Sequence, residues 1–93
     1  MLIINGTAEF MLKDGERTQG DIHGFNLFAN SDNLEDKLND IEQYLVSRGW
    51  DNIELTDNGI IDDVTAIKHN VLMEAFNKAK EEGLAVVVNN TPH

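Results

Sequence analysis

The stretch that decides the fold is residues 64–90, VTAIKHNVLMEAFNKAKEEGLAVVVNN. Its first part has apolar residues at spacings of three and four, the pattern of an amphipathic helix. These residues are Val64, Ile67, Val71, Leu72, Ala75, Phe76 and Ala79. Asp62 and Asp63 precede the pattern and are suited to accept hydrogen bonds from the first free N–H groups. Gly83 is suited to end the helix, because glycine adopts a left-handed conformation without steric cost. We therefore predict one long helix that begins at Val64.

The second part of this stretch is the apolar run Leu84–Val88. Five apolar residues without alternation predict a strand that is covered on both faces. Such cover is typical of a strand in the middle of a sheet, and the preceding helix can fold back on it. We therefore predict a central strand here.

Two strands are predicted before the first helix. In residues 2–12 the even-numbered positions are apolar or glycine, whereas the odd-numbered positions include Asn5, Thr7 and Glu9. This period of two indicates a long strand with one buried face. Gly6 within it indicates a bulge or a close approach of another backbone. Asp14-Gly15 is a turn signal, and residues 22–29 form a second apolar run. The two strands are expected to form a hairpin.

The next segment, residues 30–50, has the signals of a helix with both ends marked. Asp32 and Glu35 resemble a capping box at its start, and Gly49 is suited to end it. Trp50 is expected to pack on the end of the helix, a structural role for the only tryptophan. The apolar stripe of this helix consists of Leu34, Leu38, Ile41 and Leu45.

Residues 51–61 predict a short strand followed by a turn. Ile53 and Leu55 alternate with polar residues, and Asn58-Gly59 is a strong two-residue turn signal. We expect a strand, a turn and a connection to the last helix. The alternative is a small hairpin between residues 53–55 and 60–61.

These elements give the order β-β-α-β-α-β in a single domain, residues 1–93. The predicted class is α+β (mixed α/β), a two- or three-layer sandwich with one four-stranded mixed sheet and two helices. Strands joined through helices are expected to run parallel, so the second, third and fourth strands should be parallel and the first antiparallel to the second. Whether both helices share one face of the sheet stays open.

The charge of the chain is strongly negative and uneven. Seventeen acids and seven bases give −10, and residues 32–63 contribute ten acids against Lys37 and Arg48 alone. This charge disfavours direct binding of nucleic acid, which depends on lysine and arginine, and disfavours anionic membranes. The acidic stretch is either a solvated surface or a surface that meets a basic protein.

The candidate partner-binding residues follow from this charge and from one side of the last helix. On that helix, His69, Met73 and Phe76 are expected to form a small contact patch. The full candidate set is Asp32, Glu35, Asp36, Asp40, Glu42, Asp57, Asp62, Asp63, His69 and Met73.

No motif in the sequence indicates catalysis, a cofactor or a metal. The chain has no cysteine, and its three histidines, His23, His69 and His93, have no known ligand spacing. Glycine-rich phosphate loops and nucleophile elbows are absent from the sequence. Because no catalytic motif is present, we expect no enzymatic activity. Residues 1–10 resemble neither a signal peptide nor a membrane span, so we expect a cytoplasmic protein.

Three functions of different classes remain. The first is a small acidic interaction or regulatory protein, such as an inhibitor, an immunity protein or an antitoxin, that binds a basic partner. The second is a homo-oligomeric domain, a homodimer in the simplest case, that associates through a sheet face or a strand edge. The third is a small-ligand binder or an enzyme, which requires a pocket with convergent polar groups.

Overall fold

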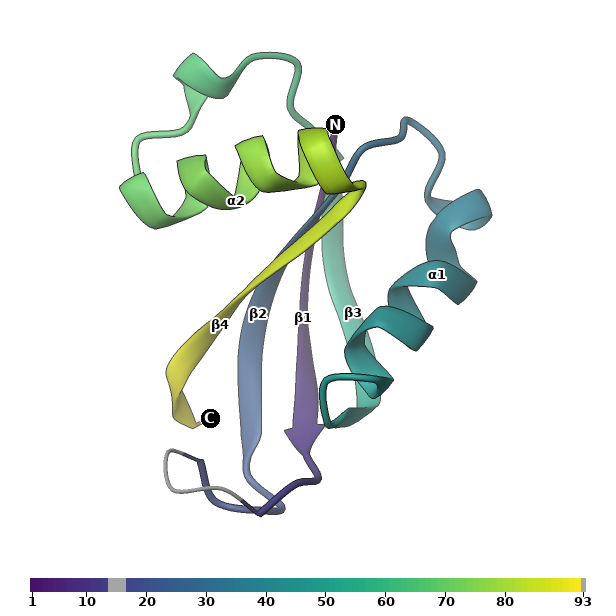
Figure 1. The fold of residues 1–93 in the computed structure, drawn as a ribbon, viewed down its shortest axis with the longest axis vertical. Coiled ribbons are helices and arrows are strands. Elements are labelled where there is room, and N and C mark those ends of the chain that lie inside the picture. The colour runs from purple at the N-terminus through teal and green to yellow at the C-terminus, as the bar shows by residue number, and fades with distance from the viewer. Residues whose placement is uncertain (14–16, 93) are drawn as a thin grey trace.

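A computed structural model describes residues 1–13 and 17–92 of the chain (Figure 1). The predicted turn at Asp14-Gly15 and His93 therefore lie outside the described residues. The elements follow in the order β1 (Leu2–Phe10), β2 (Ile22–Ala29), α1 (Leu34–Val46), β3 (Trp50–Ile60), the 3₁₀ helix η1 (Val64–Ala66), α2 (Asn70–Glu82) and β4 (Leu84–Pro92).

The four strands form one sheet in the order β3-β1-β2-β4, and all neighbouring pairs are antiparallel. The α+β class, with four strands and two helices, is therefore confirmed. The predicted mixed sheet, with the second, third and fourth strands parallel, is wrong. The β1–β2 hairpin lies in the middle, and the two later strands add to its outer edges (Figure 1).

The paths of the two helices explain why no parallel pair forms. Helix α1 runs back along the sheet, so β3 runs in the same direction as β2, but it pairs with β1 instead of β2 (Figure 1). Helix α2 lies across one end of the sheet (Figure 1). Because α2 does not return the chain to the other end, β4 starts where β3 finished and runs antiparallel to β2.

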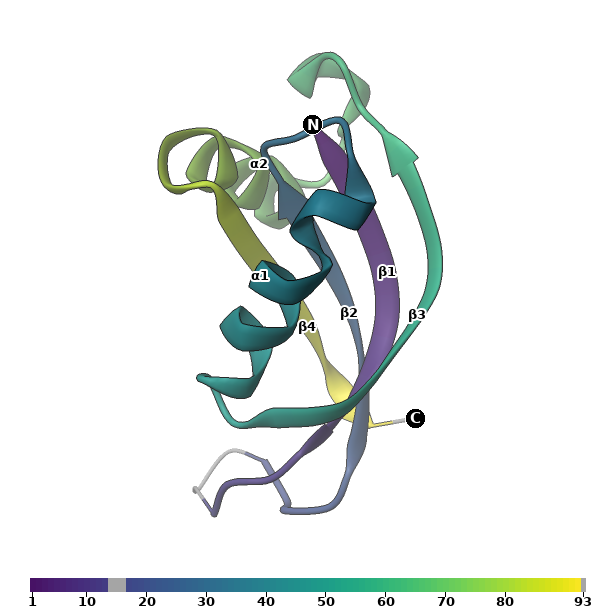
Figure 2. The same ribbon diagram turned by 90° about the vertical axis from the view of Figure 1, so that its right-hand side faces the viewer.

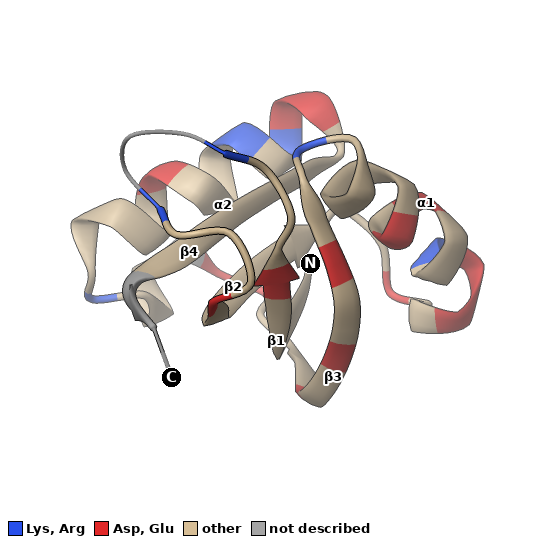
Figure 3. Ribbon diagram, turned by 90° about the horizontal axis from the view of Figure 1, so that it is seen from below, with Lys and Arg blue, Asp and Glu red and all other residues tan. Residues whose placement is uncertain are grey.

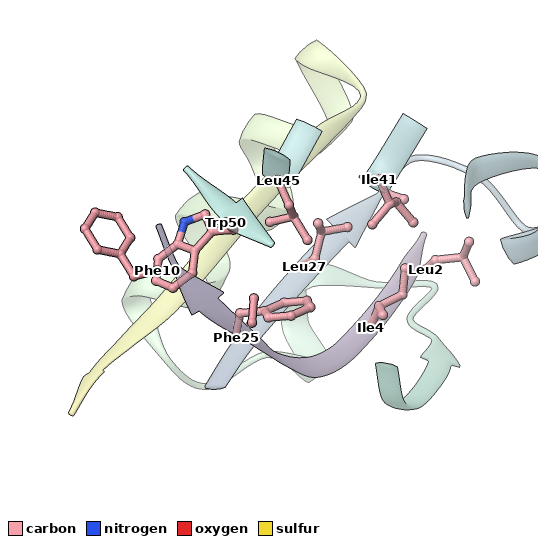
Figure 4. Packing of buried hydrophobic residues seen from close by; sticks show 10 residues of the cluster. Leu2, Ile4, Phe10, Phe25, Leu27, Ile41, Leu45 and Trp50 are labelled. Carbon is pink, nitrogen blue, oxygen red and sulfur yellow. The ribbon is translucent and has the colours of Figure 1, made fainter. Parts of the chain in front are cut away.

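Helix α1 covers one face of the sheet and packs on the larger of two apolar clusters. Ile41 and Leu45 of α1 point toward Leu27 of β2, and Phe10 lies beside Trp50 (Figure 4). The buried members of this cluster are Leu2, Ile4, Ala8, Phe10, Phe25, Leu27, Ala29, Ile41, Leu45 and Trp50. The even-numbered residues of β1 supply its floor, as the period of two predicted.

Helix α2 covers the opposite face. Its buried residues Ala75, Phe76 and Ala79 pack with Phe28 and Ala85, whose side chains point away from the first cluster. The ring of Phe28 meets that of Phe76 edge to face at 6.1 Å between centroids. The two helices therefore lie on opposite faces of the sheet.

Strand β4 is an edge strand, and its predicted central position is wrong. Its apolar run nevertheless has cover on both faces, as predicted. Leu84, Val86 and Val88 pack against the α1 cluster, whereas Ala85 and Val87 pack against the α2 cluster. An edge strand between two helices on opposite faces therefore has the composition of a central strand.

The last helix is shorter than predicted. Residues 64–66 form the separate 3₁₀ turn η1, and α2 starts only at Asn70. Ile67, in the connection between them, is buried in the α2 cluster. Val71, placed in the core stripe by its spacing, is 56% exposed. The connection bends the chain so that residues before and after it belong to different helical registers.

The predicted turn at Asn58-Gly59 is wrong, because β3 continues through it to Ile60. β3 pairs with β1 from one end to the other, with Leu2 opposite Ile60, Ile3 opposite Gly59 and Phe10 opposite Trp50. The register shifts twice, between Asn5 and Gly6 and between Thr7 and Glu9. These bulges confirm the irregularity predicted at Gly6, and they bend and twist the strand.

The N-terminus of α1 is capped by Asn33 and not by Asp32. The Asn33 Oδ1 accepts hydrogen bonds from the backbone N–H groups of Glu35 at 3.0 Å and Asp36 at 3.4 Å. Asp32 lies one residue outside the cap and is 85% exposed, with its Oδ1 3.7 Å from the amino group of Met1.

This cap makes a testable distinction between two neighbouring polar residues. Asn33→Ala is expected to lower the free energy of unfolding by about 1 kcal/mol, the usual effect of removing a cap. Asp32→Ala should change it much less, because exposed ion pairs contribute little. Urea denaturation followed by circular dichroism measures both. A larger effect at Asp32 than at Asn33 would contradict the observed cap.

None of the helices within residues 1–13 and 17–92 is both long and apolar enough to cross a membrane.

Candidate functional site

The acidic candidate residues do not gather in one place. Figure 3 shows acidic positions along both α1 and β3, two elements that share one side of the molecule. All eight acidic candidates are exposed. Five of them lie on α1 or just before it, namely Asp32, Glu35, Asp36, Asp40 and Glu42, and the other three are Asp57 on β3 and Asp62 and Asp63 after β3. Their role in binding stays a prediction, but their positions divide them into groups.

Helix α1 carries its acids on two different sides. Glu35 and Glu42 are seven residues apart, two turns, and therefore share a side. Asp36 and Asp40 lie on another side, where the Asp40 Oδ2 is 3.9 Å from the Lys37 Nζ. The side of Glu42 borders a hollow of the surface.

Strand β3 carries acids on the face of the sheet away from α1. Asp57 pairs with Asn5, and Glu54 pairs with Thr7. Side chains of directly paired residues lie on the same face of a sheet, and Asn5 and Thr7 alternate with the buried residues under α1. Asp57 is therefore separated from the acids of α1 by the sheet itself.

A groove between α1 and β3 brings apolar and acidic side chains together. Its volume is about 360 Å³, and we name it the α1–β3 groove; it is lined by Leu38, Ile41, Glu42, Asp51, Asn52, Ile53 and Leu55. Leu38, predicted as part of the core stripe, is 43% exposed here. The bulged part of β3 includes Asn52, whose φ of 48° is positive, and it curves along this side of the molecule (Figure 2).

The α1–β3 groove has two chemical parts. Leu38, Ile41, Ile53 and Leu55 provide apolar surface, and the other lining residues are Glu42, Asp51 and Asn52, with no lysine or arginine among them. The Asp51 Oδ1 accepts a hydrogen bond from the Asn52 backbone N–H at 2.8 Å, which holds that carboxylate in place. Such a surface suits an apolar side chain with a cationic neighbour.

Asp63 stabilises a turn. Its Oδ1 accepts a hydrogen bond from the Thr65 backbone N–H at 3.0 Å. The backbone and the side chain of Thr65 hold the pKa of Asp63 below its ordinary value of 3.8. Because the folded pKa is the lower one, this contribution to stability is present above the ordinary value and is lost as the pH falls through the folded pKa. The carboxylate predicted to cap a long helix thus caps η1.

The predicted patch on α2 is only partly at the surface. Phe76 is a core residue with 6% exposure, and Met73 is half-buried against the same cluster. His69 is exposed at the N-cap of α2, where its side chain makes no capping hydrogen bond. A second groove of about 340 Å³ lies here; we name it the α2–β4 groove, and it is lined by Asn26, His69, Val71, Leu72, Val87, Val88 and Asn89.

His23 is buried, which the sequence did not indicate. It is 1% exposed, and its ring meets that of Trp50 edge to face at 5.5 Å. Its Nδ1 lies 2.7 Å from the carbonyl oxygen of Asn89 and must donate, because a carbonyl can only accept. This bond ties β2 to the end of β4, a structural role. Within the described part of the chain, no three His, Asp or Glu side chains are grouped so that they could hold a metal ion.

Sequence reasoning named Glu42 as a candidate but not Asp51, the other acid that lines the α1–β3 groove, and it did not indicate the groove itself. Leu38 has the same helical spacing as the core residues Ile41 and Leu45, so the sequence contains no signal that it stays exposed. Comparison of the chain with protein-family models, with curated proteins and with solved structures finds no match.

Proposed function

We propose that this protein acts by binding another protein, and that the α1–β3 groove receives an apolar side chain from a segment rich in lysine and arginine. The observation that carries this proposal is the composition of the groove, which is lined by apolar residues together with the acidic residues Glu42 and Asp51. An apolar anchor that fills a pocket inside a polar rim is a common arrangement in protein–protein interfaces.

The charge of the whole chain supports the same partner chemistry. At −10, the protein attracts a basic partner over a distance and speeds their encounter. Inhibitors, immunity proteins and antitoxins act in this way when their targets handle nucleic acid or phosphate and are therefore basic. The protein belongs to this functional class in our proposal.

The lining residues favour binding over chemistry. The α1–β3 groove is lined by no histidine, serine, threonine or lysine, so it offers neither a hydroxyl nor an amine nucleophile and no histidine base. Its two acidic residues, Glu42 and Asp51, are exposed, whereas a catalytic carboxylate usually lies in a buried, apolar setting. A cytoplasmic location fits this role and is part of the proposal.

Selection of peptides from a random display library tests the proposal without knowledge of the natural partner. The immobilised protein is expected to enrich peptides in which an apolar residue is flanked by lysine or arginine. Leu38→Ser and Glu42→Lys should each raise the dissociation constant for these peptides by at least about fivefold, as measured by titration calorimetry. Binding should also weaken as salt is raised.

The matched control is Glu81→Lys, which makes the same charge change as Glu42→Lys but on an exposed position of α2. The control should bind the selected peptides nearly as well as the wild type. Enrichment of acidic peptides, or equal loss of binding in Glu42→Lys and Glu81→Lys, would contradict the α1–β3 groove as the binding site.

A further inference from the structure

The free edge of β4 is a surface that the proposed function does not use. β4 is the last strand of the sheet and pairs only with β2 within the described residues. An edge strand exposes a row of backbone N–H and C=O groups that can pair with another strand. Residues 84–92 of β4 contain no charged side chain, although charges are the common means of blocking such an edge.

The other edge of the sheet, β3, is protected in three ways. It carries Asp51, Glu54 and Asp57, and its register is broken by two bulges. In addition, Asp57 Oδ1 accepts a hydrogen bond from the Asn58 backbone N–H at 2.9 Å, as Asp51 does from Asn52. These side chains occupy backbone donors of an edge strand. Valine and leucine side chains cannot do this for β4.

The phase of the β2–β4 pairing identifies which backbone groups of β4 face outward. The Asn30 N–H donates to the Gly83 carbonyl at 2.9 Å, so this pair is a hydrogen-bonded one. Hydrogen-bonded pairs recur at every second residue of an antiparallel ladder. The backbone N–H and C=O groups of Ala85 and Val87 therefore bond to β2. The N–H and C=O groups of Leu84, Val86 and Val88 therefore point to the free edge.

We propose that β4 pairs antiparallel with β4 of a second copy of this chain, about a twofold axis at Val86. Val86 then lies opposite the partner's Val86, and Leu84 lies opposite the partner's Val88. Three pairs that each exchange two bonds give about six backbone hydrogen bonds between the copies. The two sheets become one continuous sheet of eight strands.

Two features of the edge favour a second copy as the occupant. First, the three residues whose backbone groups face the free edge are Leu84, Val86 and Val88, and all three have branched aliphatic side chains that are half-buried in one protomer. Antiparallel pairing about Val86 therefore places an aliphatic side chain opposite an aliphatic side chain in every pair. Second, an uncharged strand is where two chains of −10 can approach, whereas pairing through β3 would oppose its acids.

The α2–β4 groove adds apolar surface beside this edge. Val71 and Leu72 of α2 line it together with Val87 and Val88, and Val71 is 56% exposed. In the proposed pairing, the partner's Ala85 lies opposite Val87, on the face where this groove opens. A second copy therefore covers apolar side chains on both faces of β4 as well as its backbone edge.

The test is the mass of the full chain in solution, measured by sedimentation equilibrium from low to high micromolar concentration. The expected mass is twice the 10.4 kDa of one chain. Val86→Pro removes an outward N–H without removing a bond to β2, a position where proline is tolerated at an edge. It should raise the dissociation constant of the dimer by at least about 100-fold, with unchanged circular dichroism. Glu54→Lys, on the other edge, should leave the dimer intact.

Amide hydrogen exchange tests the same pairing without a variant, in case Val86→Pro unfolds the chain. The amides of Leu84, Val86 and Val88 should become protected as concentration rises, whereas those of Ala85 and Val87 should be protected throughout. A monomeric mass at high micromolar concentration, or a dimer in which the Val86 amide exchanges freely, would overturn the proposal. Neither result bears on peptide binding by the α1–β3 groove.

Discussion

Gly6→Ala is expected to lower the free energy of unfolding by about 3 kcal/mol, the upper part of the range for adding a methyl group to a packed interior. Gly6 lies in the middle of β1 between β2 and β3. A Cβ atom there would collide with the carbonyl oxygen of Glu54 and lie 2.8 Å from the Phe25 Cζ. One of these obstacles is backbone and the other is a buried ring, so neither can move aside without loss.

The bulge beside Gly6 explains why only glycine fits. Asn5 pairs with Asp57, but Gly6 pairs with Leu55, so β3 carries one extra residue at this point. The backbone of β3 comes close to β1 there, and the Phe25 ring fills the space that a side chain would take. The free energy of unfolding of a domain of this length is usually about 5–14 kcal/mol. The loss expected for Gly6→Ala is therefore a large part of the total.

Gly59→Ala is the matched control for Gly6→Ala. Gly59 also lies in the sheet, but a Cβ there would meet only the Ile3 Cγ2, at 4.0 Å. Since alanine restricts the unfolded chain, Gly59→Ala should be neutral or stabilising by roughly 0.5 kcal/mol. Denaturant unfolding followed by the fluorescence of Trp50 measures both variants. Similar losses in the two variants would mean that the collision at Gly6 does not exist.

Trp50→Ala is expected to have an effect as large, about 3–5 kcal/mol. Trp50 is 5% exposed at the start of β3 and contacts residues from separate parts of the chain. Its ring lies 5.0 Å from that of Phe10 and 5.5 Å from that of His23, and the Arg17 guanidinium lies 5.4 Å from its centre. Its removal leaves a cavity where β1, β2 and β3 meet.

Two further variants test whether the large loss in Trp50→Ala comes from the removal of a buried aromatic ring. Trp50→Phe keeps an aromatic ring beside Phe10 and should cost only about 1–2 kcal/mol. Leu38→Ala, on the exposed side of α1, should cost less than about 1 kcal/mol. Thermal unfolding followed by circular dichroism is suitable, because each kcal/mol shifts the midpoint by about 4–8 °C in a domain of this size. Equal losses in Trp50→Ala and Leu38→Ala would contradict the packing seen here.

The candidate site shows where prediction from sequence ended. The excess of acids in residues 32–63 was evident from the sequence, and Glu42 and Asp51 belong to it. The exposure of Leu38 was not evident, because its helical spacing equals that of the buried Ile41 and Leu45. Whether Leu38 is covered depends on the path of β3, and the bulges that shape this path depend on pairing with β1, a strand more than 40 residues earlier.

The sequence by itself determined the kind and order of the elements. The period of two in β1, the apolar residues of β2 and the apolar run of β4 each record which faces of a strand are covered, and covered faces require apolar side chains. Only the tertiary structure decided which strands are neighbours, that β4 is an edge, and that α2 begins at Asn70 after a separate turn. The physical reason is that burial at a position requires an apolar side chain there, so the period of the apolar residues indicates which faces are buried. Strand pairing and helix orientation are made by backbone groups and packing between segments far apart in the chain, and every residue type offers the same backbone groups.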